Sequence, residues 1–211
     1  MSNTTIQIFQ LIVLYASMVI HEVSHGLMAY KLGDPTAKLA GRLSFNPLRH
    51  IDPFGTVILP LFLLLVGSPF VICYAKPVPF NPNNFRDVKK GIILTGMAGP
   101  LSNIGLALIF GILIRVFGVF GILSPSLAVL LFVVVYLNLL LAFFNLAPFP
   151  PFDGHHLFLS VLPEKFSGLK NFLMTNYIFL MFVWVFFVFP YLIVPLVYQL
   201  SLIFAGNSFG F

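Results

Sequence analysis

The sequence predicts an all-α polytopic membrane protein with about four to six transmembrane or re-entrant helices. Of its 211 residues, 59% are hydrophobic and only 8% are charged, whereas soluble domains have about 25% charged residues. This composition leaves too few polar groups for a water-exposed surface, and it is too apolar for a disordered chain. Because no polar linker or repeat divides the sequence, we expect one integral membrane domain over residues 1–211 and no nucleic-acid partner.

Four stretches have the length and apolar character of membrane spans: residues 8–30, 92–120, 125–146 and 172–204. Ser124 and Pro125 suit the cap and first turn of the third span. No Lys or Arg precedes the first span, so we expect it to be permanent rather than a cleaved signal peptide. The last stretch contains Pro190 and Pro195, and it fits either one kinked helix or a span followed by a shorter helix.

A shorter apolar stretch, residues 57–73, either crosses the membrane or enters it and returns. Basic residues favour the cytoplasmic side. If the stretch re-enters, ten basic residues share one side and only Arg115 lies near the other face; if it crosses, the ten split four against six. The re-entrant topology therefore predicts a multi-pass membrane protein with its N-terminus outside. The ten residues are Lys31, Lys38, Arg42, Arg49, Lys76, Arg86, Lys89, Lys90, Lys165 and Lys170.

Three ionisable residues lie inside the first span, in the sequence HEVSH at positions 21–25. His21 and His25 are four residues apart, so both imidazoles share one helical face and can bind one zinc ion. Glu22 is adjacent to this pair and can act as the general base toward water. The alternative is a chance match with buried structural histidines. In a membrane span, however, an unpartnered Glu22 would cost several kcal/mol.

A catalytic zinc site normally has three protein ligands, and Asp153 is the best third candidate. It is the first carboxylate after the third span, in the sequence NLAPFPPFDGHH. His25 precedes Lys31 by about 9 Å of helix, which puts the metal nearer the cytoplasmic face. The re-entrant topology delivers Asp153 to the same side. Alternatively, Asp153 and Gly154 form a turn or a helix cap.

These residues resemble the site-2 protease family of intramembrane zinc metalloproteases, in its compact bacterial and archaeal form. HEVSH matches the zinc helix of that family, and NLAPFPPFDG at 145–154 matches its second motif. GMAGPLSN at 96–103 resembles the start of the middle core helix, and AKPVPFNPNNFR at 75–86 resembles a segment of the compact members. The resemblance covers a catalytic core of about residues 8–160, followed by C-terminal helices at about 172–206. We expect neither a PDZ insertion nor a CBS tail.

The resemblance implies one zinc ion per chain, bound by His21, His25 and Asp153, with Glu22 as general base. Asn145 matches an asparagine that holds the substrate or polarises its carbonyl, and an interhelical hydrogen bond is the alternative role. His155 and His156 stand at positions where many members of that family have small or other polar residues. They fit either a role in orienting Asp153 or an ordinary interfacial position.

The resemblance further implies hydrolysis of peptide bonds in or near the transmembrane segment of a membrane protein or a remnant signal peptide, as in regulated intramembrane proteolysis. Residues 39–45 and 74–80 have extended patterns, and they are expected to form a small membrane-associated β-hairpin whose edge binds substrate. Two alternatives remain: a non-proteolytic, metal-binding membrane adaptor, and a small metal or proton transporter. The sequence leaves the oligomeric state open.

Overall fold

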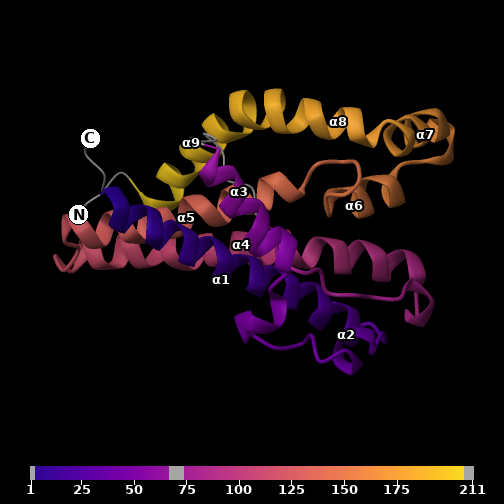
Figure 1. Cartoon of the computed structure of the whole chain (residues 1–211), viewed down its shortest axis with the longest axis horizontal. Helices are drawn as coiled ribbons and strands as arrows, with labels where there is room; N and C mark the ends of the chain where they lie inside the picture. The colour runs from indigo at the N-terminus through magenta and orange to yellow at the C-terminus, as the bar shows by residue number, and fades with distance from the viewer. Residues whose placement is uncertain (1–2, 67–73, 207–211) are drawn as a thin grey trace.

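The computed structural model describes residues 3–66 and 74–206, and its regular elements are helices (Figure 1). In this part of the chain, four helical paths are long and apolar enough to cross a membrane. This confirms the predicted polytopic helical class. The paths are α1 (Asn3–Lys31), α4 (Val88–Val119), α5 (Pro125–Asn145), and the continuous run of α8 (Tyr177–Val183), the π-helix η5 (Trp184–Ile193) and α9 (Val194–Ala205).

Shorter helices lie between these spans along the chain. They are α2 (Thr36–Leu39), η1 (Pro47–His50), η2 (Pro53–Ile58), α3 (Leu59–Leu65), η3 (Pro82–Asn84), α6 (Gly154–Val161), η4 (Glu164–Phe166) and α7 (Ser167–Thr175).

Local sequence signals set the ends of the long helices. The Asp87 side chain caps α4 by accepting from the Lys90 N–H at 3.0 Å, and Ser124 caps α5 by accepting from Leu127. Pro125 occupies the first turn of α5, as predicted. Beyond α1 the chain turns at Gly33, whose φ of +111° favours glycine. The starts of α4 and α5 therefore lie where capping side chains satisfy free backbone N–H groups.

The core of the bundle lies among α1, α4, α5 and α9, where small residues permit close packing. Ala107 of α4, Val135 of α5 and Val197 of α9 are fully buried in one cluster. A Cβ on Gly111 would lie 2.8 Å from the carbonyl oxygen of Phe204, so α4 and α9 meet backbone to backbone at this glycine. Such small-residue contacts are typical of helix pairs in membranes.

The last span is one bent helical path rather than two separate helices (Figure 1). Its middle is π-helical and contains Pro190, which lacks the N–H of a regular helix and bends the path. At its far end, Arg115 of α4 donates through Nε to the Phe204 carbonyl at 2.9 Å. The one basic residue expected near the other face therefore caps the C-terminus of α9.

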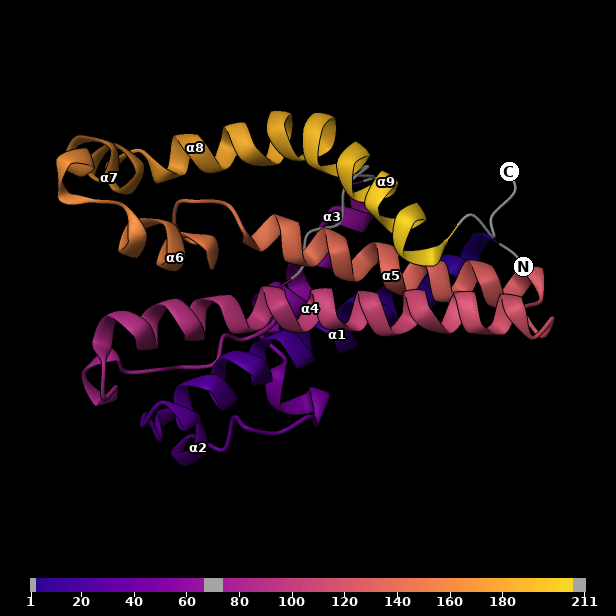
Figure 2. The same ribbon diagram turned by 180° about the vertical axis from the view of Figure 1, so that it is seen from behind.

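The loops rich in basic residues gather at one end of the bundle. Figures 1 and 2 show the N-terminus, the end of α9 and the α4–α5 turn at one end, and α2, the start of α4 and α7 at the other. The chain between α1 and α4 therefore leaves and returns at the same end, and the re-entry of residues 57–73 into the membrane stays a prediction.

Two backbone hydrogen bonds join the segments before and after residues 67–73 of the short apolar stretch. Tyr74 donates its N–H to the Gly55 carbonyl at 3.2 Å, and Lys76 donates to the His50 carbonyl at 2.9 Å. The described helices η2 and α3 together cover Pro53–Leu65, about 20 Å of helix and shorter than the 30 Å hydrocarbon core. Residues 67–73 of the predicted stretch, with Cys73, lie outside the described residues.

The expected β-hairpin is not supported, because residues 39–45 and 74–80 contain no strand. Pro77 and Pro79 have no N–H to donate to a ladder. The carbonyls of Lys76 and Pro77 instead accept from the Arg42 guanidinium, at 2.7 and 3.3 Å. The Arg42 side chain therefore joins residues 39–45 to the backbone of residues 74–80. A β-hairpin would instead require hydrogen bonds between the two backbones.

Candidate metal centre

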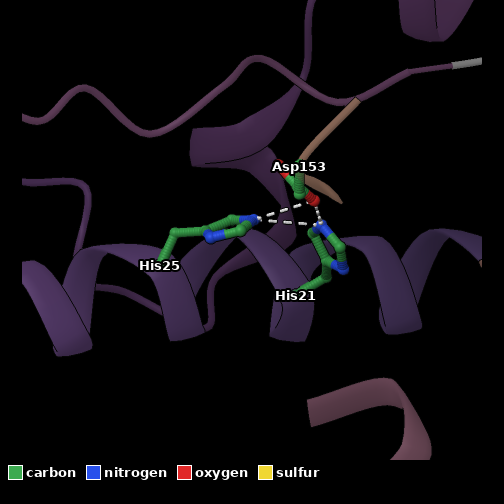
Figure 3. Close-up of side chains that lie close together, drawn as sticks. All are labelled: His21, His25 and Asp153. Atoms are coloured by element: carbon green, nitrogen blue, oxygen red, sulfur yellow. Dashed lines mark hydrogen bonds and ion pairs between the residues drawn. The ribbon is translucent and has the colours of Figure 1, made fainter. Parts of the chain in front are cut away.

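Three side chains from distant parts of the chain converge at one point (Figure 3). His21 and His25 project from the same face of α1, and Asp153 approaches from the turn before α6. Asp153 Oδ2 lies 2.9 Å from His21 Nε2 and 3.3 Å from His25 Nε2, and the two nitrogens are 3.1 Å apart. Both histidines are buried. The structure thus brings together the three residues that the sequence predicts as ligands.

Both imidazoles are held through their other nitrogen. His25 Nδ1 lies 2.6 Å from the Thr95 carbonyl oxygen, and His21 Nδ1 lies 2.6 Å from Asn103 Oδ1. Because both partners are acceptors, each Nδ1 carries a proton, and each Nε2 points to the centre. Two ring nitrogens and a carboxylate oxygen therefore face one another in a buried place.

This donor set fits a zinc ion. Three lone pairs at such distances repel one another unless a cation or protons lie between them. Ligand atoms around a tetrahedral zinc, with bonds of about 2.0–2.1 Å, are separated by about 3.3 Å. The observed separations of 2.9 to 3.3 Å are close to that value. The three residues can hold a metal ion, and nitrogen and carboxylate ligands suit zinc.

Helix α4 forms the floor of the site with two glycines one turn apart. A Cβ on Gly99 would lie 2.4 Å from His25 Nε2 and 2.5 Å from His21 Nε2, positions at which any side chain would displace the ligand atoms. A Cβ on Gly96 would lie 2.7 Å from the Cβ of His156. The close approach of α1 and α6 to α4 therefore depends on these two residues.

Asp153 reaches the site because the chain folds back tightly after α5. A Cβ on Gly154 would lie 2.3 Å from the Leu146 carbonyl oxygen, so only glycine permits this return. Asp153 stands at the cap position of α6 but makes no side-chain capping bond there. Its carboxylate faces the histidines instead, in contrast to the alternative of a simple turn or cap residue.

Glu22 lines the small cavity beside these ligands, where an extended segment covers it. The cavity has a volume of about 120 Å³, and its lining residues are Glu22, His25, Pro77, Val78, Phe80, Gly96, Asp153 and His156. Val78 donates its N–H to Glu22 Oε2 at 2.8 Å. In the sequence Pro-Val-Pro at 77–79, Val78 has the only backbone donor, and that donor orients the Glu22 carboxylate.

Asp34 anchors the covering segment beyond Phe80. This fully buried carboxylate accepts from the backbone N–H of Asn81 at 2.6 Å and from the Asn84 side chain at 2.7 Å. Burial alone would raise the pKa of Asp34, but these bonds and those from Thr36 together hold its pKa below the ordinary 3.8. Ionised Asp34 therefore stabilises the fold above about pH 4, and this contribution is lost as the pH falls through the lowered pKa.

Asp34→Asn is expected to lower the free energy of unfolding at pH 7 by about 1–3 kcal/mol, because an amide leaves buried donors unpaired. The difference from the wild type should shrink as the pH falls below 4. Denaturant unfolding of the detergent-solubilised protein at both pH values measures it. Asp87→Asn is the control for a change of carboxylate to amide, because at this helix cap the amide oxygen can still accept the Lys90 N–H, and it should cost less than Asp34→Asn at pH 7. A constant difference at both pH values would contradict the assignment.

The remaining predicted residues occupy different places. Asn145 donates through Nδ2 to the Leu141 carbonyl at 3.0 Å, within its own helix, and it does not line the cavity. Its role toward substrate stays a prediction. His155 Nδ1 lies 2.6 Å from the Phe152 carbonyl. His156 forms part of the cavity wall, with its ring edge-to-face against Phe80 at 5.8 Å, a position more central than an interfacial one.

Sequence reasoning missed several residues that shape the site. Thr95 contacts His25 through its backbone carbonyl. Every residue has such a carbonyl, so the residue type at position 95 does not indicate this role. Val78 was detectable in principle, because flanking prolines leave it as a single donor in an extended segment. Asn138 is an amide in an apolar span, and a polar residue in such a place is itself a sequence signal of a functional or packing role.

The fold and the site define a class: a polytopic helical membrane protein with a candidate metal centre of two histidines and one carboxylate. The chain is similar to "Putative zinc metalloprotease YwhC" of Bacillus subtilis, with 36% identity over 160 residues, 74% of this chain and 69% of that protein. It is 32% identical over 157 residues to "Putative zinc metalloprotease MJ0611" of Methanocaldococcus jannaschii, covering 70% of this chain and 67% of that protein. The chain belongs to the family of these zinc metalloproteases, which the motifs around His21 and Asp153 identify as the site-2 protease family.

Other relatives are longer than the region of similarity. The chain is 27% identical over 142 residues to "Putative zinc metalloprotease Rip2" of Mycolicibacterium smegmatis, covering 66% of this chain and 51% of that protein. The chain thus spans about half the length of Rip2. No family model matches the chain, and no solved structure matches it.

Proposed function

We propose that this protein is an intramembrane zinc endopeptidase that hydrolyses peptide bonds in or beside the transmembrane segments of other membrane proteins. The observation that carries the proposal is the convergence of His21, His25 and Asp153 next to Glu22, within a bundle of membrane-spanning helices. The zinc ion would be held by the first three residues. When bound, it would polarise the scissile carbonyl and make water more acidic.

The chain itself would supply proton transfer and orientation. Glu22 takes a proton from the attacking water and later passes it to the leaving amine. The N–H of Val78 occupies one oxygen of Glu22, which leaves the other oxygen free to accept that proton. Pro77, Val78 and Phe80 form an apolar part of the cavity wall, and the low polarity there strengthens the electrostatic interactions of the neighbouring charged groups. Asn145 would hold or polarise the substrate carbonyl.

The substrate class follows from where the cavity lies. We expect a transmembrane protein or a remnant signal peptide that enters from the bilayer and unwinds locally, because a helix engages its peptide carbonyls in hydrogen bonds. The extended segment around Val78 lines the cavity beside the ligands, so it would contact such a substrate. The basic loops favour a cytoplasmic location for this end of the bundle, with the N-terminus outside.

The proposal is tested with the purified protein in zinc-free liposomes that also contain dye-labelled peptides of about 20 apolar residues. We expect cleavage within the apolar segment, its loss on treatment with a membrane-permeable zinc chelator, and its return on addition of zinc. Zinc entry into the same liposomes without any cleavage would favour a transporter. Zinc binding with neither cleavage nor transport would favour an adaptor. Either result would overturn the protease assignment.

A further inference from the structure

Two buried asparagines connect the candidate metal site to the far side of the bundle core. Asn103 of α4 and Asn138 of α5 are fully buried. Asn103 Nδ2 donates to Asn138 Oδ1 at 2.9 Å, and Asn138 Nδ2 donates to the Val134 carbonyl at 2.9 Å. Asn103 Oδ1 in turn lies 2.6 Å from Nδ1 of His21. These bonds form one chain across α5, α4 and α1.

The donor and acceptor roles in this series of hydrogen bonds are fixed at its α5 end. The Val134 carbonyl can only accept, so Asn138 must turn its NH₂ group toward it and its oxygen toward Asn103. Asn103 must then turn its own NH₂ group toward Asn138 and its oxygen toward His21. An amide oxygen only accepts, so His21 carries its proton on Nδ1 and leaves Nε2 free as a ligand.

We propose that Asn138 is a positioning residue of the metal site, which orients the Asn103 amide and thereby sets the tautomer of His21. The inference deepens the proposed function, because it concerns one of the proposed zinc ligands. Without Asn138, the Asn103 amide keeps only a longer contact of its Nδ2 with the Ser17 carbonyl, at 3.4 Å, so it can rotate and present its NH₂ group to His21. That rotation moves the ring proton to Nε2, the nitrogen that must bind the metal. Groups that orient metal-bound histidines in this way contribute about 10–100-fold to metal affinity.

The hydrogen bonds from Asn138 through Asn103 to His21, here called the amide relay, lead to a prediction that distinguishes them from a packing role of Asn138. A carboxylate at position 103 accepts through both oxygens, so it needs no partner to orient it. Asn138→Leu should therefore lower zinc affinity about 10–100-fold when position 103 is Asn. The same change should have little effect in the Asn103→Asp background, where the carboxylate holds His21 directly. If Asn138 served only packing, the loss would be equal in both backgrounds.

The experiment measures zinc affinity of the detergent-purified full chain by competition with a chromophoric chelator. It compares four proteins: the wild type, Asn138→Leu, Asn103→Asp and the double variant. The ¹⁵N shifts of the histidine ring nitrogens, recorded on metal-free protein, report the His21 tautomer independently. Ser201→Ala is the control, since it removes a buried hydroxyl that bonds only within α9, to the Val197 carbonyl at 2.7 Å. This control should retain wild-type affinity.

We expect a selective loss in Asn138→Leu, with a shift of the His21 proton from Nδ1 to Nε2, and recovery in the double variant. Wild-type affinity in Asn138→Leu, or an equal loss in both backgrounds, would overturn the proposal. Neither readout requires peptide cleavage. Failure of the protein to cleave any peptide would therefore count against the proposed function alone, whereas an unchanged tautomer in Asn138→Leu would count against the relay alone.

Discussion

Glu22→Gln should leave the zinc content unchanged while peptide cleavage falls by about 10²–10⁴-fold, the usual contribution of a general acid–base. The glutamine oxygen can still accept the Val78 N–H, which donates at 2.8 Å to Glu22, so the covering segment should stay in place. An amide cannot take a proton from water, so only the chemical step is removed. Initial cleavage rates on the labelled peptide and metal analysis of the same sample measure the two effects.

The matched control is Glu164→Gln, which changes the one other glutamate of the sequence. Glu164 is exposed and pairs with Lys170 at 3.3 Å, away from the cavity. Its substitution should change neither the zinc content nor the rate. Full cleavage by Glu22→Gln would remove Glu22 from the mechanism, and loss of zinc in that variant would show that it acts on the metal site instead.

Gly99→Ala should reduce zinc from about one ion per chain toward none. The added methyl group would lie within 2.6 Å of atoms of both ligand rings, so α1 and α4 would have to separate or the imidazoles rotate. Either movement breaks the convergence of His21, His25 and Asp153. Asp153→Ala, which removes a ligand outright, gives the reference for complete loss.

Gly105→Ala is the matched control for that experiment, because it makes the same change in the same helix where no atom lies within 4 Å. It should retain zinc and stabilise α4 by up to about 1 kcal/mol, as alanine is the better helix former. Metal analysis and thermal unfolding of both variants provide the comparison. Retention of zinc by Gly99→Ala at the wild-type level would show that the ligands do not rest on α4.

The sequence predicted the spans and the candidate ligands well because both depend on strong local or compositional signals. Apolar length marked α1, α4 and α5, and the spacing of His21 and His25 placed them on one helical face. Asp153 was found by adding a topological argument, from the side on which basic residues gather. A rule about one segment therefore sufficed for the spans and the two histidines, whereas Asp153 also needed the distribution of charge along the whole chain.

The β-hairpin and the details of the site needed information that a single segment does not contain. Residues 39–45 and 74–80 have extended patterns, but Arg42 binds the backbone carbonyls that a strand partner would use. The bend of the last span depends on a π-helical section that Pro190 alone does not predict. Asn103 and Asn138 matter through the direction of their amides, which only their contacts across three helices define.

The wide separation of the ligands along the chain imposes an order on biosynthesis. His21 and Asp153 are 132 positions apart, so at about 5–20 residues per second the second is made on the order of 10 s after the first. During that interval α1 can enter the bilayer with His21, Glu22 and His25 but without their partner carboxylate. Proteolytic capability would then arise only after the ribosome has passed α5. A newly inserted α1 could therefore move past other apolar segments without hydrolysing them.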